Sequence, residues 1–287
     1  MYYGLIVLSV LMFGGGFALQ DEYRKTRGSG IASSLESSFV GALAGFVVLL
    51  VLNGFKIEFT PFTVLIAALS ALNSIMFTFC AFGALNAVNL SLFSMYSMLG
   101  GMVLPFLQGI IFYEEKLTLA KLLCLLVITA ALIMTVTRKE KKSGTAYYVG
   151  VFVLNGASGV LSKIFASSSA EKTSSLGFSV WIAILTALLS GILLPIFMRR
   201  QPPPNAYSKK LLCIGAANGA IGRVANYLLV LALAHVDASV QYPMVTGGVM
   251  IVSTLICFIG ARKPSRRELI SVLLAFIGTL LLFVIPI

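Results

Sequence analysis

The stretch NGAIGRVANY, residues 218–227, carries one arginine in the middle of a long apolar run. The run extends from Leu211 to Leu233, and Arg223 is its only charged residue. A soluble helix would turn such a side chain toward water, so the meaning of Arg223 depends on the solvent that surrounds the chain.

The composition of the chain indicates that this solvent is lipid. Of its 287 residues, 59% are hydrophobic and only 11% are charged, whereas soluble domains have about 25% charged residues. The apolar residues form blocks near the roughly 20 residues that a helix needs to cross a bilayer. Strands of a membrane barrel would be about ten residues long and would alternate in polarity. We therefore predict an all-α integral membrane protein.

The apolar blocks predict ten transmembrane helices. The first block has no basic leader, so we interpret it as a spanning helix rather than a removable signal peptide. We expect the helices at about 2–20, 31–53, 63–87, 90–112, 118–137, 146–168, 176–197, 208–234, 238–260 and 267–286.

The net charge of +11 is distributed unevenly over the loops between these helices. The loops on one side hold Arg24, Lys25, Arg27, Arg138, Lys139, Lys141, Lys142, Arg199, Arg200, Lys209, Lys210, Arg262, Lys263, Arg266 and Arg267. The loops on the other side hold Lys56, Lys116, Lys121 and Lys172. The positive-inside rule puts the basic loops in the cytoplasm and both termini outside. The charge thus indicates the topology of a multi-pass plasma-membrane protein, not a nucleic-acid partner.

The two halves of the chain resemble one another. Gly100-Gly101 aligns with Gly247-Gly248, and ALNAVNLS (84–91) aligns with ALAHVDAS (232–239). We predict one repeat at 1–137, a basic linker at 138–145 and a second repeat at 146–287. Each repeat has five helices, an odd number, so the second repeat is inverted in the membrane relative to the first.

This plan resembles the drug/metabolite transporter superfamily, in particular its ten-helix EamA-like members. The resemblance rests on the five-plus-five arrangement, on the short connections NAVN (86–89) and AHVD (234–237), and on YEEKLT (113–118). The last stretch is similar to the family's Gly-Glu-x-Leu-Thr signature, with Glu115 in the acidic position. In the second repeat Arg262 replaces that acid, and Tyr96 aligns with Pro243 where the family often has proline twice. The resemblance also implies cytoplasmic termini, whereas the charge distribution indicates the opposite.

Arg223 is predicted to lie near the middle of the bilayer, because it is about 18 Å along its helix from Leu211. An arginine at that depth costs roughly 2.5–3.5 kcal/mol and normally faces a bundle interior or a wet cavity. We predict that it points into a solvated substrate cavity; the alternative is an ion pair or carbonyl clamp that locks helices together. The residues on its face at helical spacing are Asn218, Gly219, Gly222, Asn226 and Tyr227.

Other polar and aromatic residues at similar depth are candidates for the same site. The predicted substrate-binding residues are Arg223, Asn226, Tyr227, Gln241, Tyr242, Tyr96, Asn73, Asn155 and Trp181. Trp181 is equally well explained as a cavity wall or as an ordinary buried ring. The motifs GALAG (41–45) and GAANG (215–219) are typical of close helix packing.

Glu36 is the only acidic residue well inside a predicted spanning block. It has three interpretations: an ion pair with Arg223, a proton-coupling carboxyl, or an interfacial glutamate capped by the neighbouring serines.

The leading functional hypothesis is a secondary transporter for a small polar metabolite, anionic or zwitterionic, working by alternating access. One alternative is a transporter of an organic cation held by Tyr96, Tyr227 and Tyr242 through cation–π contacts. A non-transporting receptor or scaffold is the other. No catalytic constellation, metal-ligand cluster or cofactor motif is apparent, so an enzyme is not expected. The expected partners are the small-molecule substrate and lipid; a monomer suffices and a dimer is compatible.

Overall fold

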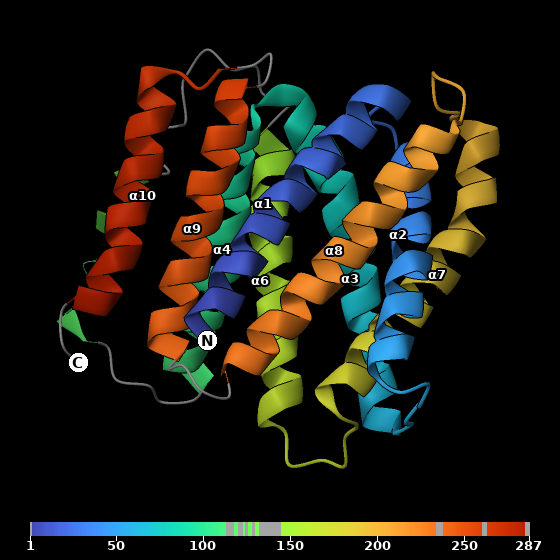
Figure 1. The fold of residues 1–287 in the computed structure, drawn as a ribbon, viewed down its shortest axis with the longest axis horizontal. Helices are drawn as coiled ribbons and strands as arrows, with labels where there is room; N and C mark the ends of the chain where they lie inside the picture. Colours follow the sequence, from blue (N-terminus) through green and yellow to red (C-terminus); the bar gives the residue numbers. More distant parts are fainter. Residues whose placement is uncertain are drawn as a thin grey trace.

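A computed structural model describes residues 2–112, 118, 119, 123, 126, 127, 130, 131, 145–233, 238–259 and 263–284. The regular secondary structure of these residues is entirely helical (Figure 1). The fifth predicted helix lies almost wholly outside the described residues, as do Glu115 and Arg262.

The remaining helices begin and end close to the predicted positions, which confirms an all-helical fold for the described residues. Their bounds are α1 Tyr2–Arg27, α2 Ile31–Leu52, α3 Pro61–Ala87, α4 Leu90–Phe112, α6 Thr145–Ser167, α7 Ser175–Arg200, α8 Lys209–Leu233, α9 Ala238–Ile259 and α10 Arg266–Val284.

Helix α1 continues seven residues beyond its predicted end at residue 20. Asp21 forms ion pairs with Arg24 at 2.8 Å and with Lys25 at 2.6 Å, one helical turn away. Such pairs stabilise a helix that has left its apolar block. The helix ends at Gly28, whose φ of +108° favours glycine. The apolar block therefore underestimated the length of α1.

Among the described residues, five helices are long and apolar enough to cross a membrane: α1, α2, α3, α6 and α7. Shorter apolar segments, Leu90–Pro105 and Met244–Ile259, lie within α4 and α9. Large apolar side chains also face outward, and those of Val47, Leu65, Ile192 and Leu255 are each more than half exposed. A soluble surface rarely exposes so many. The fold is consistent with an all-helical membrane protein.

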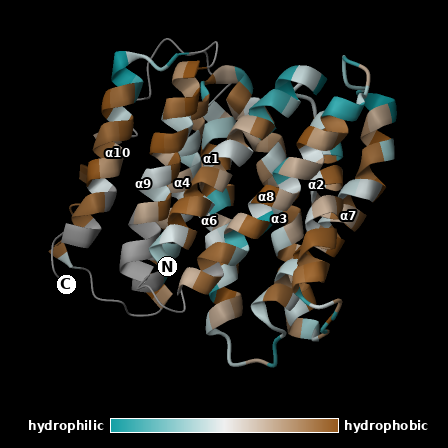
Figure 2. Ribbon diagram, in the orientation of Figure 1, coloured by the Kyte–Doolittle hydropathy of each residue, from teal (hydrophilic) through white to brown (hydrophobic). Residues whose placement is uncertain are grey.

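The helices form a bundle whose two ends differ in polarity (Figures 1 and 2). Basic residues lie where α1 and α7 end and where α8 and α10 begin, at the upper end in Figure 1. We call this the basic end. The loops 53–60 and 168–174 lie at the opposite end, together with the start of α1 and the end of α10.

Helices from the two halves of the chain alternate in the bundle instead of forming separate domains. Helix α1 packs on α8 and α9, while α2 packs on α7 and α8. Helix α3 packs on α6 and α7, and α4 packs on α6 and α9. Each of the first four helices therefore finds its main neighbours in the second half of the chain.

Candidate functional site

Glycines let α2 and α8 approach one another at the centre of the bundle. A β-carbon on Gly41 would lie only 3.4 Å from the Gly219 Cα and from the Gly215 carbonyl oxygen. A β-carbon on Gly219 would overlap the backbone of Gly41. The two small-residue motifs of the sequence therefore pack against each other, a pairing that the sequence alone did not predict.

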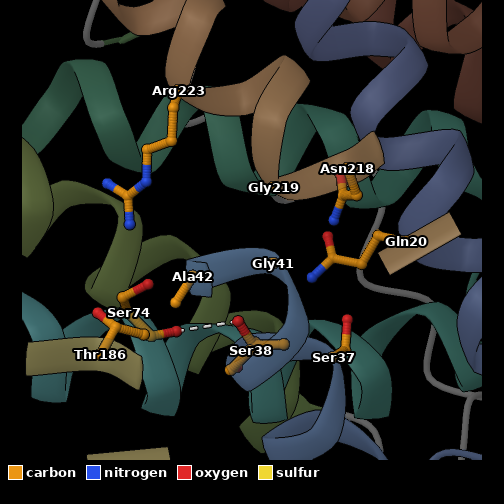
Figure 3. Close-up of a pocket in the computed structure, with 11 residues that line it drawn as sticks. Gln20, Ser37, Ser38, Gly41, Ala42, Ser74, Thr186, Asn218, Gly219 and Arg223 are labelled. Carbon is orange, nitrogen blue, oxygen red and sulfur yellow. Dashed lines mark hydrogen bonds between the residues drawn. The ribbon is translucent and has the colours of Figure 1, made fainter. Parts of the chain in front are cut away.

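The same contact holds Arg223 in position. Its side chain leaves α8 one turn beyond Gly219 and passes over Gly45, where a β-carbon would lie 2.8 Å from Arg223 Cγ. Only glycine at position 45 leaves room for this path. The guanidinium consequently points toward the space among α2, α3, α7 and α8 (Figure 3).

This space is a cavity of about 130 Å³ that five helices surround. Most of its described lining residues carry a hydroxyl or an amide or are glycine, and Arg223 is the only charged one among them. Figure 3 shows the guanidinium directed toward Ser74 and Thr186, while the amides of Gln20 and Asn218 face each other beside Gly219. The lining residues are Gln20, Ser37, Ser38, Gly41, Ala42, Ser74, Thr78, Thr186, Asn218, Gly219 and Arg223.

Two hydroxyl groups of this cavity have no hydrogen-bond partner in the described part of the chain. They are Ser38 Oγ and Thr186 Oγ1, and Thr186 as a whole is only 2% exposed. A buried hydroxyl without a partner costs about 1–3 kcal/mol. Both residues line the cavity that Arg223 borders.

Arg223 also borders a second, smaller cavity of about 50 Å³. The first cavity extends from Arg223 toward the basic end; the second extends toward the opposite end and is lined by Leu49, Ser175, Leu176, Ser179, Asn226 and Tyr227. Within the described residues, the guanidinium forms neither an ion pair nor a hydrogen bond, so the sequence alternative of a structural clamp has no support there. An arginine between two cavities without a counter-ion is suited to binding an anion.

Glu36 forms an ion pair with Arg27, not with Arg223. The Arg27 Nη2 atom is 2.7 Å from Glu36 Oε2, and the two side chains are only 5% and 7% exposed. Tyr23 donates a further hydrogen bond to Glu36 Oε1 at 2.7 Å. The sequence could not identify this pair, because Arg27 appeared to lie in a loop.

Arg27 also binds the loop 201–208, which joins α7 to α8. It donates a hydrogen bond to the Asn205 carbonyl oxygen, and its guanidinium carbon lies 5.5 Å from the centre of the Tyr207 ring. The Asn205 amide donates to the Thr26 carbonyl oxygen at 2.8 Å. Burial, and then the charge of Glu36, raise the pKa of Tyr207, so its ring stays neutral beside Arg27. We call these contacts the basic-end cluster.

A second cluster joins the two halves at the opposite end. Glu58, in the loop between α2 and α3, accepts hydrogen bonds from the Ser174 backbone N–H at 2.6 Å and from its hydroxyl at 3.1 Å. The Trp181 indole N–H donates to the Glu58 carbonyl oxygen at 2.6 Å. The Thr173 N–H donates to Thr63 Oγ1 at 3.1 Å. A carboxylate at the start of α7 is favoured by the helix dipole. We call these contacts the opposite-end cluster.

The structure brings three of the predicted binding residues together: Arg223, Asn226 and Tyr227 line the smaller cavity. The side chains of two further predicted residues, Gln241 and Tyr242, are not among those that the structure describes.

The other predicted binding residues serve helix packing. Asn73 donates to the Leu154 carbonyl oxygen at 2.9 Å and Asn155 to the Ser97 carbonyl oxygen at 2.6 Å, which clamps α6 to α3 and α4. Tyr96 stacks on the Tyr148 ring at 5.5 Å. Trp181 belongs to the opposite-end cluster and borders neither cavity.

Several cavity residues were not among the predicted binding residues: Gln20, Ser37, Ser38, Ser74, Thr78 and Thr186. A lone serine or threonine in an apolar helix gives no directional signal, because it often bonds to its own backbone. Thr78 does so here, donating to the Ser74 carbonyl oxygen at 3.0 Å.

Comparison with known proteins supports the fold but identifies no family. No protein-family model matches the sequence, and no curated protein matches it. Twenty solved chains match the structure. One crystal structure of a protein superposes with a TM-score of 0.58 and 17% identity over 96% of this chain and 94% of the other. At that identity the likeness concerns the fold alone.

Proposed function

We propose that the chain is a secondary transporter for a small anionic metabolite and that Arg223 binds the negative charge. The observation that supports this function is the guanidinium between two cavities, with no counter-ion among the described residues. A buried charge is expensive unless it is paired. A substrate carboxylate or phosphate supplies the missing partner, and the arginine can hold it bidentately.

The proposal includes ten transmembrane helices arranged as two inverted repeats. If the chain consists of two equivalent repeats, each helix has a counterpart five places away in the chain. Replacing both helices of a packing pair by their counterparts should then give another observed pair. The pair α1–α8 then becomes α6–α3, α2–α8 becomes α7–α3, and α4–α6 becomes α9–α1. The pairs α2–α7 and α4–α9 become themselves. Counterparts such as α1 and α6 run in opposite directions (Figure 1).

Alternating access would use the two clusters as gates. The basic-end cluster ties the α7–α8 loop to α1 and α2, while the opposite-end cluster ties the α2–α3 loop to α7. These are counterparts under the same five-helix exchange, and they lie on opposite sides of Arg223. Opening one gate while the other stays closed would expose Arg223 to one side of the membrane only.

The charge of the bundle ends supports an orientation in the plasma membrane. The basic end would face the cytoplasm, and the start of α1 and the end of α10 would face outward. This orientation is the one that the loop charges of the whole sequence predict.

A ligand screen on the purified protein tests the proposal. Thermal stability would be measured with amino acids, organic anions, sugar phosphates and quaternary amines, on wild type, Arg223→Gln and Arg200→Gln. The last variant removes an exposed arginine and controls for net charge. We expect anions to stabilise wild type and Arg200→Gln but not Arg223→Gln, and the same anions to be taken up by proteoliposomes. Anions that stabilise all three proteins equally would overturn the role of Arg223.

The same screen distinguishes an anion transporter from the alternative, a transporter of organic cations. Cations would need an acidic or aromatic lining; among the described residues, only the smaller cavity has an aromatic residue, Tyr227, and neither cavity has an acid. Stabilisation by quaternary amines that persists in Arg223→Gln would favour that alternative over the anion.

A further inference from the structure

We propose that the larger cavity is specific for a compact hydroxycarboxylate, a monoanion of about six or seven non-hydrogen atoms. This inference rests on the proposed function and assigns its substrate class. It follows from the charge, the volume and the unpartnered hydroxyl groups of the cavity.

The charge of the cavity matches one carboxylate. Arg223 is the only charged residue among those that the structure describes in its lining, so a phosphate dianion would keep a negative charge without a partner. An α-amino acid would bring an ammonium group, yet no carboxylate lines the cavity among the described residues. A guanidinium and a single carboxylate satisfy each other in a bidentate pair.

The volume of the cavity limits the size of its occupant. At about 130 Å³ it is slightly smaller than the engineered cavities of about 150 Å³ that hold benzene, a molecule of six non-hydrogen atoms. Larger molecules such as sugar phosphates and nucleotides exceed this space. A three- or four-carbon acid fits it.

The unpartnered hydroxyl groups indicate that the occupant itself carries a hydrogen-bonding group besides its carboxylate. Thr186 Oγ1 and Ser38 Oγ are buried, lack partners in the described structure and line the same cavity as Arg223. A substrate hydroxyl could donate to one and accept from the other. A purely apolar acid would leave both hydroxyls unsatisfied, and sites that bind a substrate hydroxyl discriminate strongly against analogues that lack it.

A series of molecules of nearly equal size tests each part of the inference. L-Lactate carries the carboxylate and the hydroxyl; propionate lacks the hydroxyl, lactamide lacks the charge, and L-alanine replaces the hydroxyl with an ammonium group. The dissociation constants would be measured by equilibrium dialysis on the purified full-length protein. We expect lactate to bind about tenfold or more tightly than each of the other three.

Thr186→Val identifies the hydroxyl contact because it removes one oxygen and keeps the side-chain shape. We expect it to weaken lactate binding about tenfold while propionate binding stays unchanged. Ser190→Ala is the matched control on α7: its hydroxyl is satisfied by the Thr186 carbonyl oxygen at 2.5 Å and it does not line the cavity. Thermal stability of both variants shows whether each remains folded.

Each outcome bears on one conclusion. Alanine or propionate binding as tightly as lactate would overturn the hydroxycarboxylate class, while the anion transporter would stand. Binding of sugar phosphates in preference to all four probes would overturn the size limit. If no anion of any size binds to wild type, the proposed function itself fails. Equal lactate affinity in wild type and Thr186→Val would overturn the hydroxyl contact.

Discussion

Gly45 offers a way to move the Arg223 guanidinium without changing any charge. Replacing Gly45 with alanine adds one β-carbon beneath the arginine side chain, 2.8 Å from its Cγ atom. Two carbon atoms pack at about 3.5–4.0 Å, so the stem of Arg223 must move by roughly 0.7–1.2 Å. Because the guanidinium forms no hydrogen bond within the described residues, the displacement changes its position more than the stability of the fold.

The expected magnitudes differ for stability and for binding. A side chain forced off its rotamer costs about 0.5–1.5 kcal/mol, so Gly45→Ala should remain folded with a small decrease in melting temperature. A displacement of about 1 Å breaks the alignment of a bidentate contact, and a loss of about 1.4 kcal/mol corresponds to tenfold weaker binding. We expect anion affinity to fall about tenfold or more.

Gly222→Ala is the matched control for this experiment. It adds the same methyl group next to Arg223, but apart from its chain neighbours and the backbone of its own helix no atom lies within 4 Å of the added carbon. Anion affinity, measured by equilibrium dialysis, and thermal stability should both match wild type in this variant. If Gly45→Ala binds anions as tightly as Gly222→Ala does, the inferred position of the guanidinium is wrong.

Three further predictions concern an ion pair, the start of α7 and a helix crossing. Glu36→Ala leaves Arg27 buried without its partner and should lower stability by about 3–5 kcal/mol in thermal unfolding, whereas a double replacement of Arg27 by Met and Glu36 by Leu should recover most of that loss; equal stability of both variants would contradict the pair. Glu58→Gln removes a charge at the start of α7 and should cost about 0.3–1 kcal/mol, a difference that high salt should diminish. Gly219→Ala should cost about 1–3 kcal/mol by overlapping the Gly41 backbone, and a melting temperature equal to that of wild type would refute the close crossing.

The positions of the helices could be predicted from the sequence because each depends on the residues of its own segment. A block of apolar residues long enough to cross a bilayer predicts a helix whatever its neighbours are. A close helix contact at Gly41 and Gly45 was readable for a similar reason, since only small residues permit such an approach, but its partner α8 was not. The continuation of α1 to Arg27 was missed because it depends on ion pairs within a polar segment.

The direction in which a polar side chain points was not readable from the sequence. Asn73 and Arg223 have comparable depth, yet Asn73 binds a carbonyl oxygen of α6 and Arg223 borders two cavities. The two side chains differ in which helices surround them, and that arrangement is set by how the two halves of the chain pack together. The same holds for Thr186, whose apolar sequence surroundings give no sign of the cavity beside it.

The contact between Gly41 and Gly219 has a mechanical consequence. No side chains interlock between Gly41 and Gly219, where the two backbones meet, so α8 can pivot at this point. Lys209 lies about 15 Å along α8 from Gly219, and a tilt of about 10° would move it by roughly 2.6 Å. That displacement is enough to separate hydrogen-bonded groups at the basic end of α8, while the other end of the helix moves in the opposite direction.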